Sequence, residues 1–146
     1  MRAVVQKSLE CRVVVDGSTV ASAGPGLVAL VGFQKGDGSE TAAKAAVKIA
    51  NMRIFPDEAG RMNLSLVDTG GTACVVPNFT VAGSTKKGHR PSFDPALEPG
   101  AAENLFELLC QNLEEAGVPV AKGVFRAHMH VHLINDGPVT IVLEIK

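Results

Sequence analysis

The 146-residue sequence contains no tryptophan and no tyrosine, and aromatic residues make up only 4% of it. Hydrophobic residues nevertheless account for 46% of the chain, so a core must be built mainly from valine, leucine, isoleucine and alanine. The length suits one domain, because domains usually contain about 100–200 residues. Residues 1–146 are therefore expected to form a single domain.

The sequence also lacks an excess of charge of either sign. Fourteen lysines and arginines stand against 15 aspartates and glutamates, for a formal net charge of −1. A protein with this balance has no global electrostatic attraction for nucleic acid. Any contact with RNA would have to be local and small.

Cysteine is scarce, and Cys11, Cys74 and Cys110 form no CxxC pair. This pattern argues against a disulfide framework and indicates reduced, packed thiols. The segment MRAVVQKS is too polar and too regularly alternating for a signal peptide, and no apolar run reaches about 18 residues. We expect a soluble, cytoplasmic protein with no membrane contact.

Short apolar runs between turns predict several β-strands. Residues 2–23 predict two or three short strands with a hairpin at Asp16-Gly17, a dipeptide typical of a type I′ turn. The almost wholly apolar run Leu27–Phe33 predicts a buried strand, and residues 73–82 predict another.

Two further segments predict helices. Residues 41–54 are rich in alanine and have Ser39 as a candidate N-cap. Their expected apolar face contains Ala43, Val47 and Ala50. Residues 101–117 end at Gly117, a typical stop signal. Their apolar stripe consists of Leu105, Leu108, Leu109 and Leu113. Many strands with two helices predict an α+β fold with a helix layer on one side of the sheets.

Three histidines recur with period two in AHMHVHL, so His128, His130 and His132 share one face of a predicted strand. A His-x-His pair can supply two zinc ligands, and a third group would complete a catalytic site. The first and third histidines would be about 13 Å apart, so all three cannot bind one ion. No cysteine or carboxylate cluster follows to complete the ligands. A solvated strand face explains the pattern better, and no metal is expected.

Asn78 and Thr80 alternate with Pro77 and Phe79 near the end of the strand predicted over residues 73–82. The alternation places an amide and a hydroxyl side by side. A hydroxyl without a neighbouring base is a weak nucleophile. A hydrogen-bonding shelf is therefore the better interpretation of this pair.

The following segment, residues 83–100, has three prolines and three glycines and predicts a long loop. Loops of this length are uncommon in compact domains and are usually functional or disordered. Its basic side chains are Lys86, Lys87, His89 and Arg90. They suit phosphate binding, although a solvated loop after an edge strand is the plainer alternative.

The sequence Asn135-Asp136-Gly137-Pro138-Val139-Thr140 separates two strand-like runs, residues 127–134 and 139–145. Proline lacks a backbone N–H and is a poor residue with which to open a paired strand. One interpretation is a closing β-hairpin whose turn happens to contain proline. In the other, Gly137-Pro138 displays bare backbone carbonyls at a protruding tip, where the peptide bond can be cis.

Four segments together strongly resemble the D-aminoacyl-tRNA deacylase family, also known for D-tyrosyl-tRNA(Tyr). They are MRAVVQKS, RIFPDEAGRMNLSLVDTGG, FTVAGSTKKGHRPSFDPA and NDGPVT, and they span nearly the whole chain in order. Members of this family hydrolyse the ester that joins a D-amino acid, or misattached glycine, to the 3′-terminal adenosine of tRNA. This hydrolase activity serves proofreading in translation quality control. The resemblance implies a three-layer β/β/α fold, a homodimer with active sites at the interface, and no cofactor.

The resemblance also implies how substrates are selected. Gly137-Pro138 would be a cis dipeptide that each subunit inserts into its partner's pocket. Its carbonyls could accept hydrogen bonds from the substrate ammonium, while its backbone occupies the space that an L side chain needs. Glycine, which has no side chain, could not be rejected in this way.

The family pattern further implies roles for residues around the predicted shelf. The catalytic element would contain Asn78, Phe79 and Thr80, with backbone N–H groups near the last two stabilising the oxyanion. The ribose 2′-OH of the tRNA would assist the chemistry. Phe125 and Met129 would help to form an adenosine pocket. The remaining substrate-binding residues would be Pro77 and Lys7, and the tRNA-binding residues would be Lys86, Lys87 and Arg90.

Two positions depart from the family pattern. Pro77-Asn78 stands where the family usually has Ser-Gln, and Lys7 stands where it usually has arginine. Lysine cannot reproduce the planar fork by which arginine would bind backbone carbonyls. Proline at position 77 also occurs in the related animal-type deacylase, which removes L-alanine from threonine tRNA. The alternatives are such an L-alanyl-tRNA deacylase and a non-catalytic nucleic-acid-binding relative, whereas the GPVT sequence favours the D-specific enzyme.

Overall fold

The computed structural model describes residues 1–146 and contains eight strands, three α-helices and one short 3-10 helix. The elements in chain order are β1 (Arg2–Val15), β2 (Ser18–Ala23), β3 (Gly26–Gly32), α1 (Ser39–Asn51), β4 (Phe55–Pro56), β5 (Met62–Leu64), α2 (Leu66–Thr69), β6 (Thr72–Pro77), η1 (Phe79–Ala82), α3 (Pro99–Glu115), β7 (Val120–Lys122) and β8 (His130–Glu144). Six strands form one sheet in the order β2-β1-β3-β6-β7, with β8 paired to β1, and β4 and β5 form a separate pair. The predicted α+β class is confirmed.

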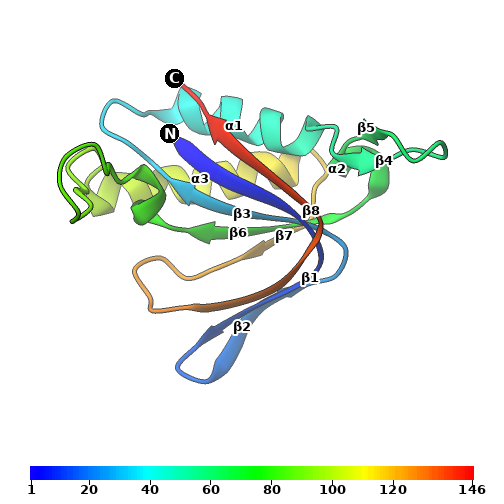
Figure 1. Ribbon diagram of the computed structural model, residues 1–146, viewed down its shortest axis with the longest axis horizontal. Coiled ribbons are helices and arrows are strands. Elements are labelled where there is room, and N and C mark those ends of the chain that lie inside the picture. The colour runs from blue at the N-terminus through cyan, green and yellow to red at the C-terminus, as the bar shows by residue number, and fades with distance from the viewer.

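The main sheet curls so that β1 belongs to two layers. The first half of β1 pairs with β3 from Arg2 to Ser8, and its second half pairs with β2 from Cys11 to Val15. Helices α1 and α3 cover one face of β3 and β6 (Figure 1). The other face is covered by β2, the second half of β1 and the first half of β8. The order is therefore helices, central strands and an outer strand layer.

The core is aliphatic, as the composition predicts. Its main cluster contains 24 buried residues, and only Phe33, Phe55 and Phe106 among them are aromatic. The predicted buried strand over Leu27–Phe33 is confirmed, because every residue of β3 except Leu30 is buried. A smaller cluster fills the space between the central and outer strands.

The buried face of α1 differs from the predicted one. The side chains that pack on the core are those of Ala42, Ala45, Ala46, Ile49 and Ala50, whereas Ala43 and Val47 are exposed. Each residue advances about 100° around a helix, so Val47 and Ile49 cannot share a face, and the larger isoleucine is buried. The N-cap is also one residue earlier than predicted, at Gly38 rather than Ser39.

The expectations for the other helix and the first hairpin are confirmed. In α3, Leu109 and Leu113 are buried and Leu105 and Leu108 are half-buried, and Gly117 follows with φ +85°. Asp16 and Gly17 both have positive φ, 48° and 78°, as a type I′ turn requires. Residues 2–23 form two strands, within the predicted two or three, but the first of them, β1, is 14 residues long rather than short.

The predicted closing hairpin is wrong. Residues 130–144 form one long strand, β8, whose two halves both pair with β1, from Arg2↔Glu144 to Gln6↔Thr140 and from Ser8↔Asn135 to Val14↔His130. The physical reason is the length of β1, which offers a continuous edge to both halves of β8. Between the two paired stretches β1 advances two residues while β8 advances five, so residues 136–139 bulge out of the ladder.

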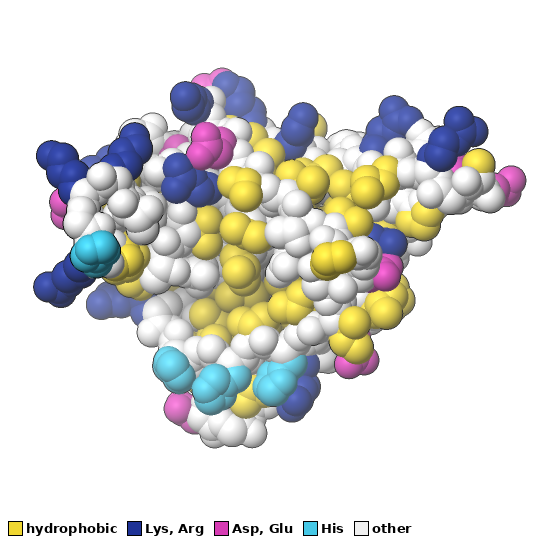
Figure 2. All heavy atoms as spheres, viewed as in Figure 1, with side chains coloured by type: hydrophobic (Ala, Val, Ile, Leu, Met, Phe, Trp, Pro, Cys, Tyr) yellow, Lys and Arg dark blue, Asp and Glu magenta, His cyan; other side chains and the backbone are white.

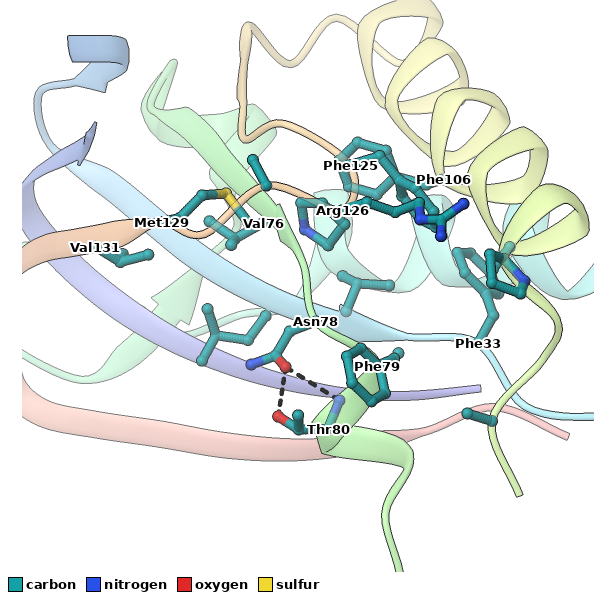
Figure 3. Close-up of a pocket in the computed structure, with 18 of the residues that line it drawn as sticks. Phe33, Val76, Asn78, Phe79, Thr80, Phe106, Phe125, Arg126, Met129 and Val131 are labelled. Atoms are coloured by element: carbon teal, nitrogen blue, oxygen red, sulfur yellow. Dashed lines mark hydrogen bonds between the residues drawn. The ribbon is translucent and has the colours of Figure 1, made fainter. Parts of the chain in front are cut away.

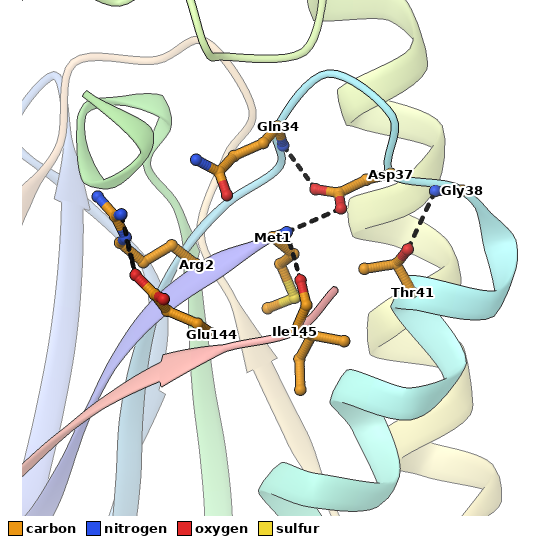
Figure 4. Close-up of polar contacts among 8 residues, drawn as sticks. All are labelled: Met1, Arg2, Gln34, Asp37, Gly38, Thr41, Glu144 and Ile145. Atoms are coloured by element: carbon orange, nitrogen blue, oxygen red, sulfur yellow. Dashed lines mark hydrogen bonds and ion pairs between the residues drawn. The ribbon is translucent and has the colours of Figure 1, made fainter. Parts of the chain in front are cut away.

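The two ends of the chain lie side by side (Figure 1), joined by hydrogen bonds between Met1 and Ile145, and the amino group of Met1 also forms an ion pair with Asp37. The amino group of Met1 donates to Asp37 Oδ1 at 2.7 Å and to the Ile145 carbonyl at 2.9 Å. The other carboxylate oxygen of Asp37 accepts from the backbone N–H of Gln34 at 2.6 Å. Figure 4 shows this network beside the start of α1, where Gly38 N–H donates to Thr41 Oγ1. The network fixes the loop that leads from β3 into α1.

All three cysteines are buried and free, as predicted. The Sγ atoms of Cys11 and Cys74 lie 2.8 Å apart between the two strand layers. Burial raises the pKa of the Cys110 thiol to about 12. No helix combines the length and the apolar composition that crossing a bilayer requires.

Candidate active site

A cavity of about 820 Å³ opens at the carboxyl ends of β3 and β6. These two strands are parallel, and ligands commonly bind where parallel strands end. The walls come from the end of β3, from η1, from the first half of α3 and from the connection between β7 and β8 (Figure 3). Fourteen of its 21 lining residues are hydrophobic. Such an apolar cavity can take a ring or base that polar groups at its edge orient.

Asn78 is fixed at the end of β6, where the strand stops. Its backbone N–H donates to the Val31 carbonyl at 2.7 Å. This contact requires Gly32, because a Cβ there would lie 2.8 Å from the Asn78 carbonyl oxygen. The predicted strand over residues 73–82 therefore ends at Pro77, and the chain turns into η1.

The side chains of Asn78 and Thr80 are nevertheless side by side, as predicted. Asn78 Oδ1 accepts from the Thr80 hydroxyl at 2.5 Å and from the Thr80 backbone N–H at 3.1 Å (Figure 3). A helix cap, rather than strand alternation, brings them together. The Thr80 hydroxyl therefore points its proton at an amide oxygen, which is no base.

The cavity has no carboxylate among its lining residues, and its ionisable side chains are Arg126 and His128. The family resemblance assigns oxyanion stabilisation to the backbone N–H groups near Phe79 and Thr80. The N–H of Thr80 already donates to Asn78 Oδ1. The backbone N–H of Phe79 is not among the groups that donate to the Asn78 side chain. A classical carboxylate acid–base pair is thus absent from the walls.

The loop after η1 folds back over Phe79. The rings of Phe79 and Phe93 meet edge to face with their centroids 5.2 Å apart. Gly83 lets them approach, because a Cβ there would lie 2.9 Å from the Phe93 ring. Phe79 is still 59% exposed, and it lines the cavity mouth. The loop ends at Glu98, because α3 begins at Pro99.

The basic residues of this loop lie outside the cavity. Lys86, Lys87, His89 and Arg90 are all exposed and form none of the ion pairs of the structure. Figure 2 shows lysine and arginine side chains projecting at this end of the molecule, beside the apolar hollow. Their place at the edge suits an extended anionic ligand.

The connection between β7 and β8 brings Phe125 and Met129 to the cavity together with Pro77. The backbone N–H of Gly123 donates to the Val75 carbonyl at 2.9 Å, which anchors the connection on β6. Phe125 packs against Phe106 of α3 with ring centroids 6.4 Å apart. Arg126 lies beside Phe125 on the same wall (Figure 3). Sequence reasoning missed Arg126, since nothing local in the sequence distinguishes it.

Gly137 and Pro138 do not line the cavity of their own chain. Their peptide bond is cis, and both residues are exposed in the bulge of β8. The Asn135 side chain closes the base of this bulge by donating to the carbonyls of Lys7 and Val139, each at 3.0 Å. Oδ1 of the same side chain accepts from Gln6 and Thr140, both at 3.1 Å.

Lys7 braces the bulge from the neighbouring strand. Its Nζ lies 2.6 Å from Asp136 Oδ2, the residue just before Gly137. The lysine side chain is 18% exposed and that of Asp136 is 34% exposed, so water only partly screens the pair. Lys7 thus contacts the Gly-Pro bulge through a side-chain ion pair.

The three histidines occupy one exposed face, as the alternation predicts. His128 and His130 stack edge to face at 5.2 Å, while Met129, Val131 and Leu133 turn toward the cavity. Figure 2 shows a row of histidine side chains along the edge of the molecule below the hollow. No group of three or more His, Cys, Asp or Glu side chains is placed to hold a metal ion.

Comparison with known proteins confirms the resemblance seen in the sequence. Residues 4–144 match the family model of D-Tyr-tRNA(Tyr) deacylase. Relatives named D-aminoacyl-tRNA deacylase include those of Thioalkalivibrio sulfidiphilus, 52% identical over 99% of this chain and 97% of the relative, and Geobacter sulfurreducens, 48% identical over 100% and 96%. A solved structure titled c-Myc DNA Unwinding Element Binding Protein superposes with a TM-score of 0.95 at 34% identity, covering 100% of this chain and 99% of that one.

A second solved structure, described as a probable eukaryotic D-amino acid tRNA deacylase, shares the fold with a TM-score of 0.84. It is 17% identical, and the match covers 99% of this chain and 98% of that one. The family match and the full-length relatives together settle the classification: the chain belongs to the D-Tyr-tRNA(Tyr) deacylase family.

Proposed function

We propose that this protein hydrolyses the ester bond between a D-amino acid and the 3′-terminal adenosine of tRNA, and that it also accepts glycyl-tRNA. The observation that carries the proposal is the apolar cavity whose mouth holds the hydrogen-bonded Asn78–Thr80 turn, in a chain of this family. The proposed products are a free amino acid and a free tRNA, which is a proofreading outcome for translation.

The adenosine of the substrate fits the apolar part of the cavity. Phe125 and Met129 provide faces on which a base can pack, and Pro77 lies close to Met129 beside Gly123. The ester then lies at the η1 end, where the turn can hold its carbonyl. This placement leaves the amino acid at the mouth of the cavity.

The chemistry relies on positioning rather than on a protein base. No carboxylate lines the cavity, and the Thr80 hydroxyl donates to Asn78. The substrate itself carries a hydroxyl next to the ester, the ribose 2′-OH, which can assist the attack of water. The amide of Phe79 would stabilise the developing oxyanion, while Asn78 keeps the turn in place.

Chirality is proposed to be sorted by a second copy of the chain. Gly137 and Pro138 are exposed, rigidly braced by Asn135, and absent from their own cavity. Beside them the outer face of β8 exposes Ile134 and Val142, which suits an apolar homodimer interface. In the dimer the Gly-Pro carbonyls would face the substrate ammonium, and the backbone would exclude an L side chain.

The proposal is tested by comparing hydrolysis of D-Tyr-tRNA, Gly-tRNA, L-Tyr-tRNA and L-Ala-tRNA by the purified protein. We expect release of D-tyrosine and glycine and no release of L-tyrosine. Rapid release of L-alanine alone would show an animal-type specificity instead. Binding of uncharged tRNA with no release of any amino acid would show a non-catalytic nucleic-acid-binding relative.

A further inference from the structure

Arg126 has an unusual backbone conformation for a residue with a long side chain. Its φ is +61°, and Asp16 is the only other non-glycine residue with positive φ. Asp16 belongs to a type I′ hairpin turn, where this region is required and aspartate is tolerated. Arginine has no such local reason, because its Cβ meets the following carbonyl in this conformation. A glycine at this position would be free of that strain.

The strained conformation puts the guanidinium at the edge of the cavity. Gly123 N–H donates to the Val75 carbonyl and Phe125 packs on Phe106, so the segment just before Arg126 is anchored on both β6 and α3. Arg126 then lines the cavity with an exposed side chain that takes part in no ion pair (Figure 3). The permanent positive charge on this wall has no anionic partner in the protein.

The chemistry of the proposed substrate decides which part of it can pair with this charge. In an aminoacyl-tRNA the carboxyl group is esterified and carries no charge, while the amino group is a cation that a guanidinium repels. The phosphodiesters next to the terminal adenosine are the anions that every such substrate brings. Arginine binds phosphate oxygens through two parallel hydrogen bonds, which makes it the suited side chain.

The arrangement of the cavity agrees with this assignment. Figure 3 shows Arg126 on the wall next to Phe125 and Phe106, and Thr80 on the opposite side of the cavity. A nucleotide whose base lies in the apolar interior and whose ester lies at Thr80 therefore has its phosphate on the side of the arginine.

We propose that Arg126 binds a backbone phosphate of the tRNA acceptor end and so positions the terminal adenosine in the cavity. The proposal rests on the aminoacyl-tRNA hydrolysis proposed above and adds a residue to it. Arg126 is a binding residue here, and it takes no part in the proton transfers.

The test is the variant Arg126→Gly, in which the backbone strain is relieved together with the charge. Its thermal unfolding temperature should be unchanged or higher, so a defect would not come from misfolding. With D-Tyr-tRNA we expect KM to rise about tenfold, as for one charge-assisted hydrogen-bonded contact, with kcat unchanged. The slope of log(kcat/KM) against log[salt] should become shallower by about 0.7, the value for one phosphate of a single strand.

A phosphate-free substrate, 3′-O-(D-tyrosyl)adenosine, separates this role from others. Wild type and Arg126→Gly should hydrolyse it equally. A similar loss with this small substrate would overturn the proposal, because the arginine would then act on the adenosine or on the shape of the cavity. An unchanged KM and salt slope with the full tRNA would overturn it as well.

Two controls keep this result apart from the proposed function itself. Arg61→Ala removes an equal charge from the exposed β4–β5 turn, away from the cavity lining, and should leave KM unchanged. Uncharged tRNA binding, measured by fluorescence anisotropy, should weaken about tenfold in Arg126→Gly. This binding measurement needs no hydrolysis. If wild type released no D-tyrosine, the proposed function would be refuted, and the binding assay would still decide whether Arg126 contacts a phosphate.

Discussion

At the scale of single residues, two asparagines hold the backbone of the candidate site through neutral hydrogen bonds. Asn78 uses one amide oxygen to hold both the hydroxyl and the backbone N–H of Thr80. Asn135 performs the same task for the Gly-Pro bulge, with its amide nitrogen on two carbonyls and its oxygen on two donors. Both asparagines fix the backbone, and the proposed function assigns the contacts with the substrate to main-chain atoms.

The variant Thr80→Ala should keep substantial deacylation activity. Its hydroxyl proton is directed at Asn78 Oδ1, so the side chain cannot be activated as a nucleophile. Losing one neutral hydrogen bond of about 1 kcal/mol predicts a fall of roughly fivefold in the rate. The measurement is single-turnover deacylation of D-Tyr-tRNA, with Thr19→Ala in exposed β2 as the matched control. A complete loss would show that the hydroxyl performs proton chemistry.

At the scale of elements, short caps decide where strands stop and helices begin. The four-residue helix α2 leads the chain from β5 into β6, and Ser65 and Asp68 cap it reciprocally. Asp68 Oδ2 accepts from the Ser65 backbone N–H at 2.8 Å and from its hydroxyl at 2.7 Å. These hydrogen bonds lower the pKa of the Asp68 carboxyl below its ordinary 3.8. The stability that the cap contributes must therefore depend on pH.

The sign of this dependence follows from the lowered pKa. The contribution of the Asp68 carboxylate is fully present above the unfolded pKa and is lost as the pH falls through the folded pKa. Asp68→Asn should unfold at a lower temperature than wild type at pH 7, and the difference should narrow below about pH 3.8. Thermal unfolding followed by circular dichroism checks this, with exposed Glu58→Gln as the control. A difference that stays constant or widens at low pH would contradict the cap.

Several elements follow from sequence because their causes are local. The Asp16-Gly17 turn needs positive φ at both positions, and the run Leu27–Phe33 is too apolar to lie anywhere but in the interior. The amide–hydroxyl pair of Asn78 and Thr80 was also found, although a cap rather than a strand forms it. Local chemistry therefore predicted that the side chains of Asn78 and Thr80 are neighbours, but not the backbone conformation that brings them together.

The errors have non-local causes. The NDGP segment has the composition of a turn, and only the length of β1 on the neighbouring edge makes it a bulge in β8. The predicted buried face of α1 is wrong because alanines occur on several sides of this helix and do not distinguish one face from another. Only the choice between Val47 and Ile49 fixes the buried face, and Ile49 is the buried one. Arg126 gives no signal in the sequence, since its positive φ arises from the way the connection is anchored on β6 and α3.

At the scale of the whole molecule, the two faces of the chain differ in what they leave uncovered. The helices α1 and α3 cover one side, whereas β1 and β8 expose Leu9, Ile134 and Val142 near the Gly-Pro bulge. Contiguous apolar surface on a small protein marks an interaction site. A second copy that covers this face would also bring its Gly137-Pro138 to the first copy, so association and chirality selection should be lost together.

The variant Val142→Asp tests this link. Val142 is 64% exposed, and its neighbour Leu143 points into the core, so an aspartate should leave the protomer folded while opposing burial of the face. Sedimentation velocity should give wild type at twice the 15.2 kDa of one chain and the variant at 15.2 kDa. The control Val47→Asp changes an equally exposed valine, 62% exposed on α1, and should stay dimeric and active. A monomeric Val142→Asp that still releases D-tyrosine and spares L-tyrosine would show that one chain alone distinguishes the two hands.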